Sequence, residues 1–327
     1  MIRIGVIGAG YWGEKLISEY LALSSRNPNV KICGVADTSP QRLYYVKDKY
    51  NLPDKILFRN HSEVLSSDKG IDAVHIATPN ESHYEIAMEA VERGKHILLE
   101  KPMTVSSRSA FKLAREAEKA GKVLLIGHIF RFNNAINEAK RVIESGGLGD
   151  VHYLCLKWTT YMKELPERDI IFDLAPHPVD IVNHLLEEWP TSVYSIARSF
   201  KRGKPGLEDT AFVTMNLPGD MVAGINLSWI QPGVKTREVV IVGEKSTLYI
   251  DALDQRMRLC KNEGEYFNIE LEANNTIGSM ISHFIDRIVN GSPPVNSPLI
   301  GAMTVHVLEK MRESVEKKTS VNVLATP

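Results

Sequence analysis

Cysteine is scarce in this chain of 327 residues, and its three cysteines are Cys33, Cys155 and Cys260. They share no C-x-x-C spacing, which excludes a disulfide framework and a thiolate zinc site. Cys33 and Cys155 each lie in an apolar, strand-like run. We therefore expect both to be buried as small hydrophobic side chains.

Net charge is also almost absent, at −1, so there is no electrostatic reason to expect a nucleic acid or an anionic membrane surface as a partner. No uninterrupted apolar stretch approaches the ~20 residues that a membrane span needs. Met1-Ile2-Arg3-Ile4 enters a strand pattern at once, without the charged and apolar regions of a secretory signal. We expect a cytoplasmic protein with neither a membrane nor a nucleic-acid partner.

The length of the chain exceeds a single hydrophobic core and indicates two domains. In residues 1–129, short apolar runs rich in β-branched residues alternate with amphipathic helical segments. The expected strands are Ile2–Ile7, Val30–Ala36, Ala73–Ala77, Ile97–Leu99 and Val123–Ile126. Helices are expected over Glu81–Arg93, capped by Asn80 or Ser82, and from Ser106 or Ser107 to Ala120. This alternation predicts a Rossmann domain, with an α/β doubly wound parallel sheet.

The pattern changes after a predicted helix at Asn133–Glu144 and a glycine-rich break at 146–149. Longer strands with partial alternation are expected at Val151–Thr160, Ser192–Phe200, Thr210–Leu217 and Met221–Ile230. Two hairpins follow, Glu238–Asp251 and Arg256–Glu272, the second turning near Gly264, and helices are expected at Pro176–Leu186, Ile277–Asn290 and Leu299–Glu316. Residues 130–327 are thus predicted to form an α+β domain with a large, mainly antiparallel sheet. We expect this domain to bind the substrate and to mediate oligomerisation.

A glycine motif, Gly8-Ala9-Gly10-Tyr11-Trp12-Gly13, joins the first expected strand to a helical segment. Its first glycine permits a tight turn, its second lets the backbone approach a pyrophosphate, and its third lets helix and strand pack closely. The helix N-terminus then offers N–H groups to the phosphates. Tyr11 and Trp12 are expected to pack locally.

Asp37 stands at the end of the second expected strand, where it can accept hydrogen bonds from the ribose hydroxyls of a dinucleotide. A 2′-phosphate there would meet a like charge, so NAD is favoured over NADP. Arg42, five residues further on, is either a contact for such a phosphate or an exposed helix residue.

A second set of residues resembles the glucose–fructose oxidoreductase, inositol dehydrogenase and rhizopine-catabolism (Gfo/Idh/MocA) family in its order and spacing. The set is Ala77-Thr78-Pro79-Asn80, Glu100-Lys101-Pro102, Gly127-His128 and Asp173-Leu174-Ala175-Pro176-His177-Pro178-Val179-Asp180. The resemblance covers nearly the whole chain and implies a nicotinamide-dependent dehydrogenase. It further implies that Lys101 and His177 are the catalytic pair and that Asp173 helps to hold the substrate. Ala77, Thr78, Pro79, Asn80, Glu100 and Lys101 are expected to line the cofactor site.

Independent chemistry fits these roles. Transfer of a hydride from a secondary alcohol needs a base for the hydroxyl proton, and histidine suits that work near neutral pH. Lysine can polarise the developing oxyanion or relay a proton. The alternatives to these catalytic roles are that Lys101 is only an exposed loop residue and that His177 is only a residue at the start of a helix. Asp173, His177, Asp180 and His184 also resemble a metal stripe, but Pro176 and Pro178 disturb that geometry, so no metal is expected.

Substrate contacts are expected from His128 and Arg131 after a strand end, and from Tyr161, Lys163 and Arg168 in the connection leading to Asp173. The segment Arg168–Phe172 departs from the family, because many relatives have a glycine-rich segment there. The Asp-Leu-Ala-Pro-His form resembles members that oxidise nucleotide sugars, so the C3 hydroxyl of a UDP-N-acetylhexosamine is the leading expectation. Inositol, a free sugar, a cycle in which the cofactor never leaves, and a non-catalytic dinucleotide sensor are the alternatives. A broad antiparallel sheet needs a cover for its second face, which favours a homodimer or homotetramer.

Overall fold

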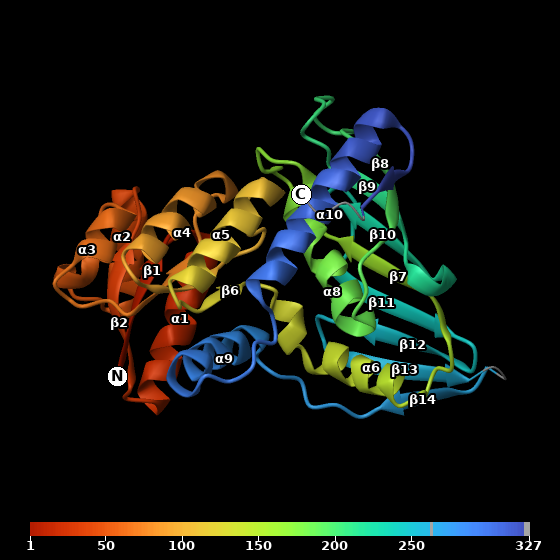
Figure 1. Cartoon of the computed structure of the whole chain (residues 1–327), viewed down its shortest axis with the longest axis horizontal. Helices are drawn as coiled ribbons and strands as arrows, with labels where there is room; N and C mark the ends of the chain where they lie inside the picture. Colours follow the sequence, from red (N-terminus) through yellow and green to blue (C-terminus); the bar gives the residue numbers. More distant parts are fainter. Residues whose placement is uncertain (262–263, 324–327) are drawn as a thin grey trace. The chain divides into compact units, whose positions relative to one another are not determined.

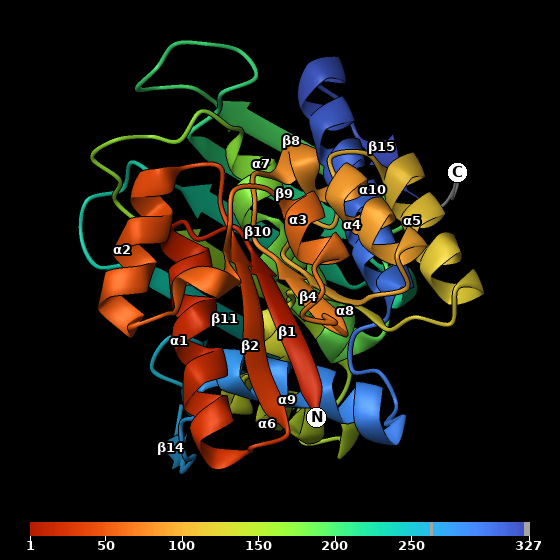
Figure 2. The ribbon, with the colours of Figure 1, turned by 90° about the vertical axis from the view of Figure 1, so that its left-hand side faces the viewer.

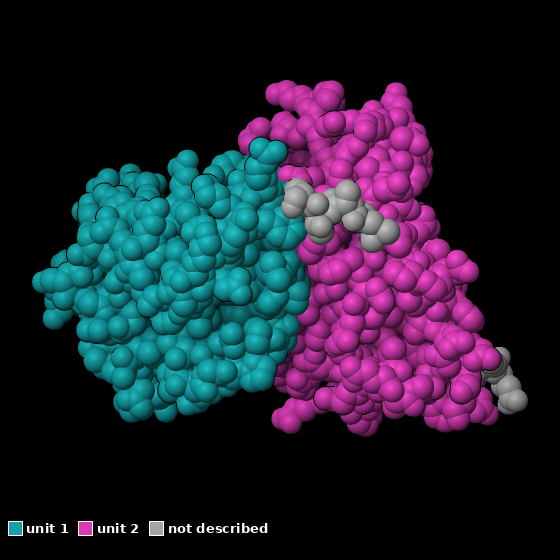
Figure 3. Space-filling model, in the orientation of Figure 1, with its two compact units in different colours: residues 1–127, 277–302 teal, residues 128–276, 303–327 magenta. Residues whose placement is uncertain are grey.

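The computed structural model describes residues 1–261 and 264–323, and the chain divides into two compact units (Figure 1). Residues 1–127 and 277–302 make up the first unit, and residues 128–276 with the chain from 303 onward make up the second (Figure 3). The sequence predicts one boundary, between 129 and 130. Segment 277–302 instead joins the first unit, where the Asn296 side chain donates to the carbonyl of Ile126 and Gly301 lies against Met103.

The first unit contains a six-stranded sheet whose strands all pair in parallel. Its order is β3-β2-β1-β4-β5-β6, from Leu57–Phe58, Val30–Ala36, Ile2–Ile7, Ala73–Ile76, His96–Leu99 and Leu124–Ile126. The β-branched runs are buried because helices cover both faces. All five predicted strands are confirmed, with ends that differ by at most one residue. The order reverses between β1 and β4, where doubly wound sheets bind their ligands.

The helices of this unit flank the sheet, with α1 and α4 on opposite sides of β1 (Figure 2). They are α1 (Tyr11–Arg26), α2 (Pro40–Tyr50), α3 (His61–Ser66), α4 (His83–Glu92), α5 (Ser107–Lys119) and, apart from its first residue, α9 (Thr276–Asn290). The expectation that Asn80 or Ser82 caps α4 is wrong. A short helix, η2 (Asn80–Ser82), precedes α4, and the Ser82 hydroxyl donates to Thr78 Oγ1 or Pro79 O instead of accepting from α4.

The second unit contains a nine-stranded sheet in the order β14-β13-β12-β11-β7-β10-β9-β8-β15. The strands are β7 (Val151–Thr159), β8 (Ser192–Arg198), β9 (Thr210–Asn216), β10 (Val222–Ser228), β11 (Thr236–Gly243), β12 (Ser246–Asp251), β13 (Arg256–Lys261), β14 (Tyr266–Ile269) and β15 (Val321–Asn322). Only β7 and β10 pair in parallel among the described strands, which confirms a mainly antiparallel sheet. Residues 262 and 263, in the turn predicted near Gly264, lie outside the described residues.

One face of this sheet packs against α6 (Asn134–Glu144) and α8 (Pro176–Leu186), with Trp158 and Leu156 of β7 in the shared core. The helix α7 (Ile170–Leu174) and the later turns of α10 (Pro298–Lys317) belong to the same unit. The prediction that Cys155 is buried is wrong, because it alternates with Leu154 and Leu156 and points to the other, exposed face. Cys33 is half-buried. Within the described chain, no helix has the length and apolar character to cross a membrane.

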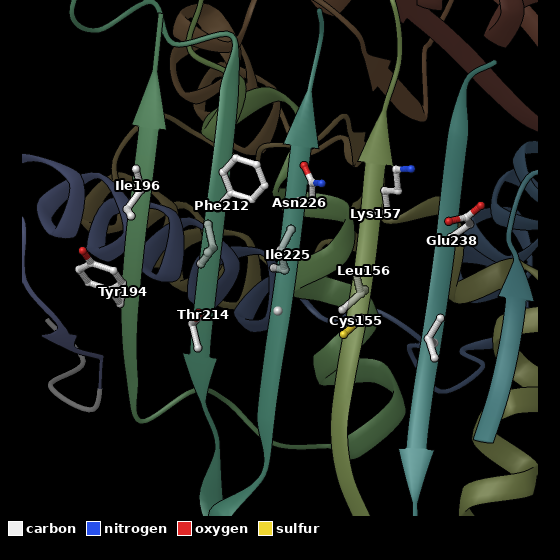
Figure 4. Close-up of a pocket in the computed structure, with 13 residues that line it drawn as sticks. Cys155, Leu156, Lys157, Tyr194, Ile196, Phe212, Thr214, Ile225, Asn226 and Glu238 are labelled. Carbon is white, nitrogen blue, oxygen red and sulfur yellow. The ribbon is translucent and has the colours of Figure 1, made fainter. Parts of the chain in front are cut away.

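The exposed face of the sheet is hollowed, and Figure 4 shows the side chains that line it. Strand pairing sets one row across five strands, Ile196–Phe212–Asn226–Lys157–Glu238. The neighbouring row is Tyr194–Thr214–Gly224–Cys155–Val240. Because the second row has small residues at its centre, a hollow of about 500 Å³ opens beside Phe212 and Tyr194.

Candidate active site

The glycine loop connects β1 to α1 in the first unit. Gly8 has φ 99°, and a side chain there would lie 2.5 Å from the carbonyl oxygen of Ala77. At Gly13 a Cβ would lie 1.8 Å from the carbonyl oxygen of Gly8. Gly10 differs, because a Cβ there would meet no atom within 4 Å. The loop is thus tight at both ends and open at Gly10, beside the start of α1, which is the shape that a dinucleotide diphosphate requires.

Asp37 follows β2 and holds the glycine loop. Its Oδ2 accepts from the N–H of Ala9 at 2.7 Å, and its Oδ1 accepts from the N–H of Ser39 at 2.8 Å. Each oxygen keeps a second lone pair that can accept from a ribose hydroxyl. Arg42 is exposed in α2.

The side chains inside the loop contact one another. Lys15 Nζ lies 4.5 Å from the ring centre of Tyr11 and 5.4 Å from that of Trp12. Tyr11 is nonetheless 70% exposed, so little besides Lys15 covers its ring.

The segment Ala77–Asn80 follows β4, and the N–H of Ala77 donates to Ile7 O at 2.8 Å, so it lies beside the glycine loop. His83, at the start of α4, links this segment to the one after β5. Its Nε2 is 3.0 Å from Thr78 O and its Nδ1 is 2.9 Å from Pro102 O. Burial lowers the pKa of His83. His83 was not predicted as part of the site, since no local pattern distinguishes it from a core residue.

Glu100 and Lys101 follow β5, and the Lys101–Pro102 peptide bond is cis. The Glu100 carboxylate turns inward, where its Oε1 lies 3.3 Å from His75 Nε2. His75 Nδ1 in turn lies 3.2 Å from the hydroxyl of Tyr20. Burial raises the pKa of Tyr20, so its hydroxyl keeps its proton. Glu100 is therefore anchored in the first unit next to half-buried Lys101.

In the second unit, Asp173 lies in α7 and His177 in the first turn of α8. Asp173 precedes α8 as expected, but the separate helix α7 was not predicted. Asp169 caps α7 by accepting from the N–H groups of Ile171 and Phe172, at 3.1 and 3.4 Å. The ring of His177 packs edge-to-face against Phe130 with centres 5.2 Å apart. Asp173 Oδ1 lies 3.1 Å from Arg168 Nη2.

Arg131 is 6% exposed, and its guanidinium group binds α8. Nε donates to Asp180 Oδ1 and Nη2 donates to Asn183 Oδ1, both at 2.7 Å. His128 is also buried, with Nδ1 3.8 Å from Asp180 Oδ1. Burial, followed by the charge of Arg131, lowers the pKa of His184 to about 4. These contacts hold Arg131 against α8, the helix whose first turn carries His177.

Tyr161, Lys163 and Arg168 lie on the connection between β7 and α7, and all three are exposed. Lys201 Nζ donates to Lys163 O at 2.7 Å, and Arg202 Nη2 donates to Arg168 O at 3.2 Å. The connection is thus held from the β8–β9 side. No group of three or more potential metal ligands occurs in the described portion of the chain.

The parallel sheet order and the glycine loop at its switch point define a dinucleotide-binding protein of the doubly wound class. An oxidoreductase family model with an NAD-binding Rossmann fold matches residues 2–128, and the GFO/IDH/MocA C-terminal domain matches residues 136–249. The chain belongs to the Gfo/Idh/MocA family of oxidoreductases, which confirms the resemblance, the enzyme class and the fold class.

Three relatives illustrate the range of the family. The chain is 26% identical to 2,7-anhydro-N-acetylneuraminate hydratase of Escherichia coli, over 91% of this chain and 82% of the relative. It is 24% identical to myo-inositol 2-dehydrogenase of Thermotoga maritima, over 98% of each. It is 29% identical to UDP-N-acetylglucosamine 3-dehydrogenase of Acidithiobacillus ferrooxidans, over 66% of this chain and 64% of the relative. A solved structure of that enzyme from the same species has the same fold, with a TM-score of 0.84, 24% identity and coverage of 97% and 98%.

Proposed function

We propose that this protein oxidises a secondary hydroxyl of a sugar or polyol with NAD. The observation that carries the proposal is the family's catalytic motif on this family's fold, with Lys101, Asp173 and His177 all present. When bound, the nicotinamide accepts the hydride. His177 takes the hydroxyl proton, Lys101 stabilises the developing oxyanion, and Asp173 holds a substrate hydroxyl. Lys101 belongs to the first unit and the other two residues belong to the second.

NAD is proposed over NADP because of Asp37. Its carboxylate is fixed by the N–H groups of Ala9 and Ser39 and cannot turn away from a 2′-phosphate without releasing the glycine loop. Like charge then disfavours NADP, while the free ribose hydroxyls of NAD find an acceptor.

Among substrates, a UDP-N-acetylhexosamine oxidised at C3 remains the leading candidate. The name of the Acidithiobacillus relative supports it. The name of the Thermotoga relative supports the alternative, an inositol.

A second candidate is a reaction without net oxidation, in which the cofactor is reduced and reoxidised within one cycle. The Escherichia coli relative, which is named a hydratase, favours it. Purified protein would then retain its cofactor, and product would form without free NADH.

The first experiment measures NADH formation with UDP-hexosamines, free sugars and inositols. Lys101→Met and His177→Ala are each expected to lower turnover ~10²-fold or more, with NAD affinity kept, because each removes a group that acts during hydride transfer. His152→Ala, which changes an exposed histidine of β7, is the matched control. Wild-type turnover in both active-site variants would refute the assignment.

The exposed face of the nine-stranded sheet is proposed as the interface of a homodimer or homotetramer. Its aromatic residues Tyr194 and Phe212 are 41% and 54% exposed. Lys157 and Glu238 stand opposite each other in one row, so the same patch carries both signs of charge (Figure 4). Such a patch is complementary to a second copy of itself.

A further inference from the structure

Arg237, near the start of β11, is a buried cation with donors left over. It is 6% exposed, and its guanidinium carbon lies 5.6 Å from the ring centre of Trp158. Nη1 donates to Thr159 O at 3.0 Å and to Thr236 O at 2.7 Å. Within the described residues, Nε and Nη2 have no hydrogen-bond partner. Neither nitrogen is among the buried atoms that lack a partner, so both donors reach solvent from an otherwise buried side chain and are open to an acceptor there.

Burial disfavours the charged form of Arg237 and lowers its pKa to about 10, and the carboxylate of Asp173 offsets only part of that effect. The same carboxylate forms an ion pair with Arg168 at 3.1 Å. Asp173 therefore acts on two guanidinium groups. Because burial penalises the Arg237 cation, an anion bound beside it would stabilise it.

Arg168, the other arginine that acts on Asp173, is also held in place through its backbone. Arg202 donates from Nη1 to Pro166 O and from Nη2 to Arg168 O. The backbone that carries Arg168 is thereby fixed, although its side chain is 45% exposed. Arg168 and Arg237 thus approach Asp173 from two different elements of the second unit.

From these contacts we infer that Arg237 and Arg168 bind an anionic group of the substrate, beside Asp173. The inference rests on the proposed function and narrows its substrate class to a sugar that carries a carboxylate or a phosphate. Planar guanidinium donors match the paired oxygens of either group. A neutral inositol or free sugar offers these guanidinium donors no charged acceptor.

The test compares the binding of two ligand pairs by calorimetry in the presence of NADH, which cannot accept a hydride. One pair is glucuronic acid and glucose, and the other is UDP-N-acetylglucosamine and N-acetylglucosamine. The anionic member of at least one pair is expected to bind ~10²-fold more tightly than its neutral partner, since charge-assisted hydrogen bonds are the strong ones. The first pair identifies a carboxylate as the recognised group, and the second identifies a diphosphate.

Variants show whether the arginines cause the preference. Arg237→Met should remove the preference for the anionic ligand, with NAD and neutral sugars bound as before. Arg237→Lys should keep only part of this preference, because lysine lacks the planar, forked donor group of arginine. Arg168→Met, at an exposed position that folding tolerates, should weaken the preference for the anionic ligand ~10-fold. The control is Arg258→Met, because Arg258 of β13 also lies over an aromatic ring, 5.5 Å from the centre of Tyr266.

Equal affinity for the members of both pairs would overturn the inference. So would an unchanged preference in Arg168→Met, or a loss in Arg237→Met that is equal for neutral and charged ligands. Binding is measured without turnover, so a wild-type protein that selects anions but transfers no hydride would refute the proposed function and leave this inference standing.

Discussion

Among single residues, Gly10 and Gly13 of the glycine loop have opposite steric surroundings. A Cβ on Gly13 would overlap the backbone of Gly8, at 1.8 Å from its carbonyl oxygen, whereas a Cβ on Gly10 would enter open space. Backbone cannot yield as a flexible side chain does. Packing within the protein thus requires glycine at position 13, and only a ligand would require it at position 10.

We therefore expect two distinct outcomes from substitution with alanine. Gly13→Ala should destabilise the first unit by about 1–3 kcal/mol or more, the cost of overpacking. Gly10→Ala should leave the midpoint of urea unfolding unchanged but weaken NAD binding ~10-fold or more, because its methyl group occupies the diphosphate position. Urea titration and calorimetry with NAD measure the two effects. Wild-type NAD affinity in Gly10→Ala would contradict a cofactor site at this loop.

The sequence predicts the residues of the cofactor loop because their partners are local. Gly8, Gly10 and Gly13 follow one strand, and Asp37 ends the next, so the pattern itself places them together. Arg237 escaped prediction because its contact with Thr159 spans 78 residues of the chain, and His83 because no local pattern distinguishes it from a core residue. The carbonyl of Thr159 reaches Arg237 only through the pairing of β7 with β11.

Arg131 illustrates the converse limit. Its position after a strand end suggested a substrate contact, yet its guanidinium group binds Asp180 and Asn183 of α8. No local pattern shows which of two arginines, Arg131 or Arg168, points into a core. The roles of Lys101, Asp173 and His177 stay predictions.

Secondary-structure elements likewise divide into those that the sequence predicts and those that it does not. The strands of the first unit are short and largely apolar, so their limits follow from sequence. Helix α7 lacks apolar periodicity and begins where Asp169 caps it, beside Arg312, whose Nη1 lies 3.4 Å from Asp169 Oδ1. Cys155 was placed on the wrong face because partial alternation in β7 does not reveal which face helices cover.

Helix α8 is anchored by a buried polar network and not by apolar contacts alone. Arg131 contacts Asp180 and Asn183, and His184 Nε2 lies 2.8 Å from Asn137 Oδ1 of α6. With its pKa at about 4, His184 is neutral at pH 7, so Arg131 is the cation that balances Asp180. The orientation of the turn that carries His177 depends on this balance.

Arg131→Met should therefore destabilise the protein by about 3–5 kcal/mol, because it leaves the Asp180 carboxylate buried without its cation. In the double variant Arg131→Met/Asp180→Leu, the loss should be smaller, since no unpaired charge remains. Urea unfolding of the three proteins measures both free energies. A double variant less stable than Arg131→Met would show that the pair does not act as a unit.

At the scale of the whole molecule, the proposed assembly rests on the exposed face of the nine-stranded sheet. Its central row places Phe212 beside Asn226, Lys157 and Glu238, over a hollow lined by Cys155 and Gly224. Antiparallel sheets commonly leave one face in water, but such faces carry polar residues. Aromatic side chains around a hollow are instead typical of an interface.

We expect a homodimer or homotetramer in which the row of one copy crosses the row of the next about a twofold axis. Phe212→Asp should then yield a monomer by light scattering at micromolar concentration, because it buries a charge at the interface core. Phe200→Asp, at a phenylalanine that is 69% exposed beyond the end of β8, should leave the assembly intact.

Lys157→Glu should weaken association, because the new carboxylate would meet the like charge of Glu238 of the partner subunit. Lys157→Glu/Glu238→Lys should restore association, because in a twofold interface position 157 of each copy meets position 238 of the other. A monomeric wild-type protein would exclude the interface, and a double variant as weak as the single one would show that Lys157 and Glu238 do not pair across it.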